Sequence, residues 1–502
     1  MKGTQKLTKK TITWIILLFV LFAFHKNLSA QGYNIKVNIP LFKDSTVILG
    51  HYLADVNSMY PNDTIKLGKN GTGVFKGSKQ LPGGMYFIYL PAKKYFDLIL
   101  SEGQVFSIDV TDTANFLKSV KFKGSVENQL FYDYRNLIGV KSAEINGIMK
   151  KKKSASKPLE RDSLTKAAEK INGEVVGYIN KIKRDNPNLF FSTFLTAIED
   201  IVVPPPPKDD KGNILDSSFQ YNYWHHHFFD NFNYADPRLL RTPVYEKPIV
   251  KYFEKVVPQT PDSIDYEIDM MLNKVKGNEE VFRYLVSSLL KYYGSSQIVG
   301  MDGVLAHIAE KWFLPYATWI DKASKEKLKK EIDRITPNIL GKVAPDLKLM
   351  QIPTDHFLLA KTDTAAKSNP YVGISFNISD IKAKYLVVVF WESDCGHCQK
   401  TMPLLYDSIY PRLKEKGVKV LAIHMVGSVA GKRKWIDFVN EHQMYDWINA
   451  WSPFSYDYMD LYNVSYKPLF YLLDENKKII CKRIGPEQIE KVIEMGGILG
   501  TK

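Results

Sequence analysis

Residues 33 to about 122 contain short apolar runs separated by turn residues. The runs include STVILGHYL, GVFKG, GMYFIYLP and YFDLILSEGQVFSIDV, with Asn, Asp and Gly between them, which is the spacing of strands and hairpins. In the segment VFSIDV (105–110), large apolar residues recur at every second position from Phe106 to Val110. Such alternation places one face of a strand in a core. We therefore expect a β-sandwich over residues 31–125.

The pattern changes to helical periodicity between about residues 126 and 335. NQLFYDYRNLI, SLTKAAEKINGEVVGYINKIK and VFRYLVSSLLKYYG carry apolar residues at intervals of three and four, as one buried helix face requires. A proline-rich break, Pro204 to Pro207, precedes a long aromatic segment. These features predict a helical domain over residues 126–340 with one long irregular excursion.

The aromatic segment contains the triplet His225-His226-His227, which raises the question of a metal site. Consecutive residues of a helix do not face one another, and no other His, Cys or carboxylate cluster nearby keeps ligand spacing. We expect these rings to pack within an aromatic surface segment, and we predict no metal site.

From Gly341 onward, strand and helix patterns alternate. YLVVVFW (385–391) is a continuous apolar run, as expected of a strand that is buried on both faces. An amphipathic stretch, the strand VKVLAIHMV (418–426), a short helix near Trp435, PLFYLLDEN (468–476) and KIICKRIG (478–485) follow, and a last helix closes the chain. This order predicts a compact α/β layer fold with a mixed sheet.

The first thirty residues resemble a secretory signal. Trp14 to Phe24 is an unbroken apolar run of eleven residues, and small residues precede a cleavage point before Gln31. An uncleaved membrane anchor is the alternative, but a spanning helix needs roughly 20 apolar residues. No cysteine near the cut offers an acceptor for lipid attachment. We expect an exported, periplasmic protein that is soluble after cleavage and has no stable membrane span. The positive residues ahead of the apolar run are Lys2, Lys6, Lys9 and Lys10.

Charge and composition exclude two classes of protein. The chain has 68 Lys and Arg against 54 Asp and Glu, a net charge of +14, and five of the lysines lie in the signal, which leaves +9. Apart from Lys150 to Lys153 the basic residues are scattered, so we expect no nucleic-acid partner. A chain that is 45% hydrophobic and 13% aromatic is globular rather than disordered.

The chain has three cysteines, and two of them, Cys395 and Cys398, are separated by only two residues. Cys395 falls where the strand 385–391 gives way to a helix, and unpaired N–H groups at a helix start favour a thiolate. This spacing is that of a dithiol/disulfide switch. A structural disulfide would close too small a ring to stabilise much, and a zinc site would need two more ligands beyond the pair. A catalytically silent remnant is the other alternative. We expect Cys481 to be a core residue.

Residues 341–502 resemble thioredoxin-fold proteins of the TlpA/ResA type, which are exported thiol-disulfide oxidoreductases of bacteria. GKVAPDLKL is similar to the lead-in of that family and VVVFWESDCGHC to its strand and active site. Pro403 corresponds to the proline that kinks the first helix. Pro468, in VSYKPLFYLL, corresponds to the proline that is cis and faces the dithiol. The order of domains resembles that of multidomain exported Bacteroidota proteins with a β-rich N-terminal domain.

The resemblance assigns roles to individual residues. Cys395 attacks the substrate disulfide and Cys398 resolves the mixed disulfide, so the two form a redox-active disulfide. Gly396 and His397 set the potential, and the backbone beside Pro468 docks the substrate. No cofactor is implied, because the cysteines carry the redox equivalents. Lys467, next to Pro468, either lies near the dithiol, where it favours the thiolate, or is a solvated loop lysine.

Two positions depart from the family pattern. Val389 stands where thioredoxins usually carry a buried acid that helps to remove the proton of the second cysteine. Asp394 stands where a tryptophan normally precedes the first cysteine. Deprotonation of Cys398 therefore needs another helper, with Glu392 and water as candidates, or it is slow.

Together these features predict a multidomain fold class: an N-terminal β-sandwich, a helical middle domain and a C-terminal α/β thioredoxin-like fold. The predicted parts are the signal peptide 1–30, the sandwich 31–125, the helical domain 126–340 and the thioredoxin-like domain 341–502. The predicted function is exported thiol-disulfide exchange with protein thiols or disulfides of the cell envelope, coupled to an unknown redox partner protein. The alternative is an envelope binding or scaffold protein in which the thioredoxin-like module is not the main activity.

Overall fold

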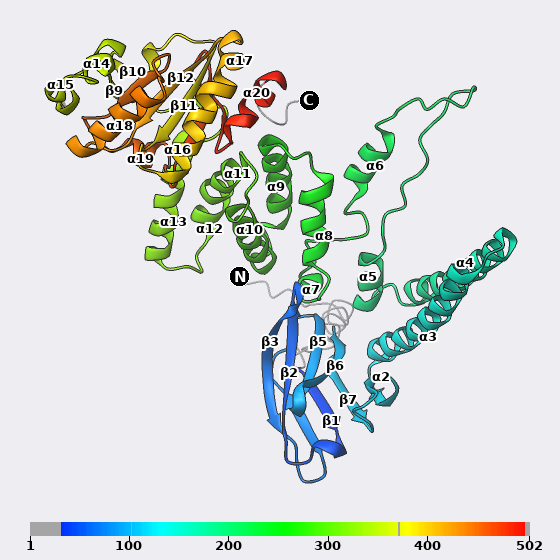
Figure 1. Ribbon diagram of the computed structural model, residues 1–502. Helices are drawn as coiled ribbons and strands as arrows, with labels where there is room; N and C mark the ends of the chain where they lie inside the picture. The colour runs from blue at the N-terminus through cyan, green and yellow to red at the C-terminus, as the bar shows by residue number, and fades with distance from the viewer. Residues whose placement is uncertain (1–31, 102, 370–371, 497–502) are drawn as a thin grey trace, which may run out of the picture. The chain divides into compact units, whose positions relative to one another are not determined.

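The computed structural model describes residues 32–101, 103–369 and 372–496 of the chain (Figure 1). The expected signal segment 1–30 lies outside the described residues. The chain divides into two compact units at Tyr252–Phe253, which is within the segment that the sequence predicts as one helical domain. The four predicted domain boundaries stay a prediction. No helix among the described residues combines the length and the apolar character needed to cross a membrane.

The first unit begins with two four-stranded sheets, in the orders β4-β1-β7-β8 and β3-β2-β5-β6. All neighbouring strands are antiparallel except β1 and β7. In β7 the expected residues Phe106, Ile108 and Val110 are buried, so the sheet-rich fold of this region is confirmed; face-to-face packing of the sheets as a sandwich stays a prediction. The strands are β1 (Asn34–Asn38), β2 (Thr46–Leu53), β3 (Asp55–Lys66), β4 (Thr72–Lys76), β5 (Gly84–Leu90), β6 (Lys94–Leu100), β7 (Val105–Val110) and β8 (Val120–Lys123).

The longest of these strands, β3, is one that the sequence pattern does not reveal. It includes Pro61 and several Asn and Asp residues, which normally indicate a turn. β3 is the edge strand of its sheet, where a proline breaks no ladder on the solvent side. The register against β2 also shifts between Leu49 and Gly50. Its position at an edge therefore explains why turn residues are tolerated in a strand.

Helices follow the sheets in the first unit, and the long helices α3 and α4 lie side by side (Figure 1). The chain between α5 and α6 has no helix and contains the expected proline-rich excursion. The rings of Tyr223 and His227 stack with centroids 4.1 Å apart, and His225 stacks on Tyr252. The helices are α2 (Phe116–Ser119), α3 (Val126–Ser154), α4 (Pro158–Asp185), α5 (Phe190–Ala197), α6 (Phe219–His227), α7 (Pro237–Leu240) and α8 (Glu246–Lys251), with the single turns η1 (Pro40–Phe42) and η2 (Pro91–Lys93).

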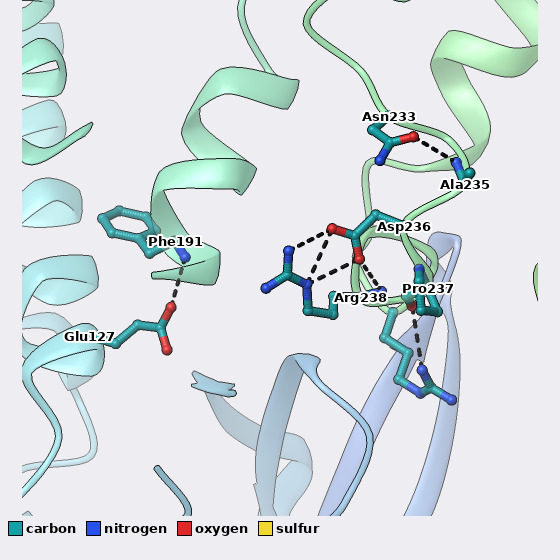
Figure 2. A network of polar contacts seen from close by, with 8 residues as sticks. Glu127, Phe191, Asn233, Ala235, Asp236, Pro237 and Arg238 are labelled. Atoms are coloured by element: carbon teal, nitrogen blue, oxygen red, sulfur yellow. Dashed lines mark hydrogen bonds and ion pairs between the residues drawn. The ribbon is translucent and has the colours of Figure 1, made fainter. Parts of the chain in front are cut away.

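Buried polar residues connect these helices to each other and to the sheet. Glu127, near the start of α3, accepts a hydrogen bond of 2.7 Å from the backbone N–H of Phe191 at the start of α5 (Figure 2). Asn128, which is fully buried, pairs with both backbone groups of Ile99 in β6. Asp236 caps α7 and binds the guanidinium of Arg238 (Figure 2). The buried side chains of Glu127 and Asn128 thus have hydrogen-bond partners, as burial requires.

The second unit begins with further helices. They are α9 (Pro261–Val275), α10 (Glu279–Gly294), α11 (Met301–His307), α12 (Leu314–Tyr316) and α13 (Lys322–Ile335), with the π-helical turns η3 (Tyr252–Val256, at the division) and η4 (Ile308–Phe313) and the turn η5 (Thr336–Asn338). The helical middle that the sequence predicts is therefore confirmed as secondary structure, although the two compact units share it.

A mixed seven-stranded sheet in the order β10-β9-β13-β12-β11-β14-β15 forms the rest of this unit. β11, β12 and β13 are parallel, and β14 runs antiparallel to β11. The strands are β9 (Lys348–Gln351), β10 (Ile374–Asn377), β11 (Tyr385–Trp391), β12 (Val418–His424), β13 (Ile448–Trp451), β14 (Leu469–Asp474) and β15 (Ile479–Lys482). The expected mixed α/β fold is confirmed.

Both faces of this sheet are covered, as the apolar run 385–391 predicts. Val387, Val389 and Trp391 belong to one core, and the intervening residues of β11 belong to the other. The helices around the sheet are α14 (Thr354–Leu359), α15 (Thr364–Ser368), α16 (Gly396–Pro403), α17 (Tyr410–Glu415), α18 (Val429–Glu441), α19 (Tyr458–Leu461) and α20 (Pro486–Glu494), with the turns η6 (Ile378–Asp380) and η7 (Leu404–Ile409).

Candidate active site

The cysteine pair lies directly after the central strand β11. Cys395 is the N-cap of α16, and its side chain is partly buried. Cys398 lies in the first turn of that helix and is fully buried. The expected position at a helix start is therefore confirmed. Pro403 ends α16, and the π-helical turn η7 follows it.

The surroundings of the two thiols shift their pKa values in opposite directions. Burial raises the pKa of Cys395, but hydrogen bonds from Cys398 and from the backbone N–H of His397, together with the charge of Lys467, bring it below its ordinary value of 9.0. Burial, the hydrogen bond with Cys395 and the charge of Glu392 raise the pKa of Cys398 to about 12. At neutral pH the partly exposed thiol is thus the better nucleophile, and the buried thiol holds its proton.

The loop 392–394 that leads to Cys395 is fixed by a histidine that sequence reasoning missed. The Nε2 atom of His424, at the end of β12, accepts a hydrogen bond of 3.2 Å from the backbone N–H of Ser393. Burial lowers the pKa of His424 to about 3, so the imidazole stays neutral and keeps this acceptor. Its ring stacks on Trp435, with centroids 4.8 Å apart. The neighbouring Asp394 forms an ion pair with Lys434.

The segment around Pro468 approaches the dithiol from the start of β14. The Lys467–Pro468 peptide bond is cis, as the resemblance implies. The Sγ atom of Cys395 lies 3.9 Å from the carbonyl oxygen of Lys467. The ammonium of Lys467 forms an ion pair of 2.5 Å with Glu392. Of the two interpretations of Lys467, the structure therefore favours the lysine near the dithiol.

The two residues between the cysteines face away from the core. Gly396 and His397 are exposed, and a Cβ atom on residue 396 would meet no atom within 4 Å. His397 contributes its backbone N–H to the lowering of the Cys395 pKa. The structure thus brings all six sequence-predicted site residues to one place, and the backbone of His397 and of Lys467 reaches the Cys395 sulfur.

Other residues with candidate chemistry take structural positions. Val389, at the position of the usual buried acid, is fully buried in the same core as Cys398. Cys481 lies in β15 opposite Leu472, is 2% exposed, and burial raises its pKa. It is a core residue in this fold. Among the residues that the structure describes, no three His, Cys, Asp or Glu side chains gather as metal ligands.

A strand–dithiol–helix unit opposite a cis-proline segment is the arrangement of a thioredoxin-like domain. Residues 383–479 match the family model described as thioredoxin-like. This part of the chain is a thioredoxin-like domain, and the resemblance to thiol-disulfide oxidoreductases of the ResA type is confirmed for it.

The relatives found are proteins named thiol-disulfide oxidoreductase ResA. That of Bacillus cereus is 27% identical over 124 residues, which is 24% of this chain and 66% of the relative. That of Geobacillus kaustophilus is 28% identical over 129 residues, 24% of this chain and 68% of the relative. The chain thus spans only about two thirds of the length of these relatives, and most of the chain lies outside the match.

Solved structures with a similar fold come from Cytophaga and Bacteroides species. A domain of a possible thiol-disulfide isomerase from Cytophaga hutchinsonii is 29% identical and covers 32% of this chain and 94% of its own, with a TM-score of 0.26. A thioredoxin-like protein from Bacteroides caccae is 19% identical and covers 59% of this chain and 99% of its own, with a TM-score of 0.40. Residues 33–131 and 212–338 match two domains of unknown function, DUF4369 and DUF5106.

Proposed function

We propose that the chain is an exported thiol-disulfide oxidoreductase that exchanges disulfides with cell-envelope proteins through Cys395-Gly396-His397-Cys398. The observation that carries the proposal is the asymmetry of the two thiols. One is partly exposed with a lowered pKa, and the other is fully buried with a pKa of about 12. That asymmetry suits an attacking and a resolving cysteine.

In the reducing direction, the Cys395 thiolate attacks one sulfur of a substrate disulfide. A mixed disulfide forms with Cys395, and the other substrate sulfur leaves as a thiolate. Cys398 then loses its proton, with Glu392 and water as candidate acceptors, and attacks the Sγ atom of Cys395. The second substrate sulfur leaves and takes up a proton. The substrate gains two electrons, and Cys395 and Cys398 become a disulfide.

Turnover requires a second thiol–disulfide protein that exchanges electrons with the Cys395–Cys398 pair. The backbone carbonyl of Lys467, 3.9 Å from the Cys395 sulfur, lies where an extended substrate chain would pass. The proposal therefore includes two kinds of protein partner, a substrate protein and a redox partner.

Selective alkylation tests this function on the full chain. Iodoacetamide should modify Cys395 and spare Cys398 and Cys481, because the latter two are 0% and 2% exposed. Its rate should rise with pH and reach half its maximum below pH 9.0, the ordinary thiol pKa, because the Cys395 pKa is lowered and only the thiolate reacts. The unmodified protein should accelerate reduction of insulin by dithiothreitol, and the alkylated protein should not. An unmodified protein without acceleration would support the scaffold alternative instead.

A His397→Pro substitution should make the disulfide less oxidising. Proline removes the imidazole and also the backbone N–H that lowers the Cys395 pKa. A less stable thiolate means a less stable reduced form, so the potential becomes more negative. One pKa unit is about 1.4 kcal/mol, which for two electrons corresponds to about 30 mV, so we expect a shift of tens of millivolts.

Equilibration with glutathione measures this shift. His397→Ala is the matched control, because it removes the imidazole and keeps the N–H, so its shift should be smaller than that of the proline variant. A potential that is unchanged or less negative in His397→Pro contradicts the role given to residue 397.

Export is the other part of the proposal, and it rests on the charged start, the apolar run Trp14 to Phe24 and the small residues before Gln31. The processed protein should begin at or near Gln31. Mass spectrometry of the protein from the envelope fraction measures its N-terminus, and a retained Met1 there would contradict cleavage.

A further inference from the structure

A cleft of about 190 Å³ opens between the helices and the thioredoxin-like domain of the second unit. On the helical side, the loop Ser296–Gly300 and Asp302 line it. On the other side, its wall is formed by Tyr466, Lys482 and Arg483. The function proposed above does not use this cleft.

The cleft begins one residue away from Lys467, which contacts the dithiol. Tyr466, which lines it and is 46% exposed, directly precedes Lys467, whose carbonyl oxygen is 3.9 Å from the Cys395 sulfur. Val299, from the loop on the helical side, packs against the core that includes Cys398. An extended chain advances roughly 3.3 Å per residue, so a substrate bound across Cys395 reaches the cleft within a few residues of its own cysteine.

The helical wall of the cleft is held firmly against the sheet. The ammonium of Lys482, which is 1% exposed, contacts the carboxylate of Asp302 at 2.5 Å. The same ammonium donates to the backbone oxygen of Asn338 at 2.5 Å and to its side-chain oxygen at 3.0 Å. The side-chain amide of Asn338 in turn donates to the carbonyl of Leu461. The start of α11, directly after the loop Ser296–Gly300, is thereby held against β15.

The cleft carries one positive charge that has no acidic partner in its walls. The Asp302 carboxylate neutralises Lys482, and Arg483 is exposed. Among the described residues, no carboxylate lies within ion-pair distance of the Arg483 guanidinium. Burial raises the pKa of Tyr466 and the charge of Arg483 lowers it, which places the guanidinium near this phenol. A guanidinium in this setting suits a carboxylate, which it can bind through two hydrogen bonds.

We propose that this cleft binds an acidic side chain of the polypeptide substrate, a few residues from the cysteine that reacts with Cys395. Arg483 contacts the carboxylate, Tyr466 packs beside it, and the loop Ser296–Gly300 closes the far side. The helical segment thus becomes a specificity element of the thiol-disulfide site. The proposal rests on the proposed function and adds a substrate class to it: proteins with an Asp or Glu near the reacting cysteine.

Matched disulfide peptides test this proposal on the full-length protein. The peptides differ only in carrying Asp, Ala or Lys at positions two to four residues from the cysteine, and their reduction is followed under turnover with dithiothreitol. Wild type should reduce the best Asp peptide with a kcat/KM about tenfold above that of the Lys peptide, an effect of about 1.4 kcal/mol, and the difference should be in KM. Arg483→Glu should reverse the order, and Arg483→Lys should retain it in weaker form.

Lys419→Glu is the matched control, because it makes the same change of charge at an exposed position near the start of β12. β12 runs parallel to β11, so its start lies at the end of the strands away from Cys395. It should leave the peptide preference unchanged. Equal rates for the three peptides in wild type would overturn the cleft proposal, as would an Arg483→Glu effect that is the same on all peptides. Turnover that persists in Cys395→Ser would instead overturn the proposed function, so the two failures are distinguishable.

Discussion

A Cys398→Ser variant is expected to lose turnover completely and to accumulate as a mixed disulfide with its substrate through Cys395. Cys395 remains at the helix start, and its carbonyl neighbour Lys467 is unchanged, so attack on a substrate disulfide still proceeds. The resolving sulfur is absent, and serine does not break a disulfide. Reduction of insulin should fall to near the rate of dithiothreitol alone. In a separate incubation with insulin and no dithiothreitol, which would itself reduce a mixed disulfide, non-reducing electrophoresis should show a new covalent adduct.

Two further variants serve as controls for this result. Cys395→Ser should be equally inactive but should form no adduct, because the remaining thiol, Cys398, is fully buried and its pKa is about 12. Cys481→Ser should keep turnover and form no adduct, because Cys481 is a core residue. Adducts in Cys395→Ser would mean that the roles of the two cysteines are reversed. In native envelopes, the Cys398→Ser adducts also identify the substrates.

Local patterns were enough to predict where the cysteine pair lies in the fold. The cysteine spacing and the apolar run 385–391 together place Cys395 at a helix start. The resemblance adds Pro468, whose peptide bond is cis. These features depend on neighbours in the sequence or on a motif of fixed spacing, so a single sequence carries them.

Contacts between distant segments were not predictable in the same way. His424 is 31 residues from Ser393, which it holds, and it has no motif around it that distinguishes it from a core histidine. The ion pair between Glu392 and Lys467 joins the residue after β11 to the segment before β14, and it forms only because these two strands are neighbours in the sheet. β3 was hidden because its turn residues are tolerated only at a sheet edge.

The contact between the helical segment and the thioredoxin-like domain was also not predictable from the sequence. A change of pattern at Gly341 predicts a boundary there. The structure places the partners of Lys482, Asp302 and Asn338, on the helical side of that boundary. A lysine in KIICKRIG looks like an ordinary strand residue in the sequence. Its burial at 1% exposure arises only because the helical segment covers the edge strand β15.

Replacing Asp302 by Ala is therefore expected to destabilise the second unit strongly. The substitution leaves the Lys482 ammonium buried without its counter-ion, and the loss of one partner of a buried ion pair costs about 3–5 kcal/mol. The side chain of Asp302 is 19% exposed, so we expect about 3 kcal/mol, near the lower end of that range. Urea unfolding of the full chain measures the change in the free energy of unfolding. Hydrogen exchange at the β15 amides, measured separately, reports the local loss of stability.

Two variants distinguish the effect of an unpaired buried charge on stability from the effect of losing an ordinary surface contact. Arg334→Ala removes an ion pair with Asp460 between the same two segments, but these side chains are 50% and 68% exposed, so the loss should be at most about 1 kcal/mol. Lys482→Met combined with Asp302→Leu removes both charges and should recover part of the stability lost in Asp302→Ala. Recovery is incomplete because both oxygens of Asn338 lose their donor. If Asp302→Ala lowers the free energy of unfolding no more than Arg334→Ala does, the Lys482 ion pair does not hold the helical segment against the sheet.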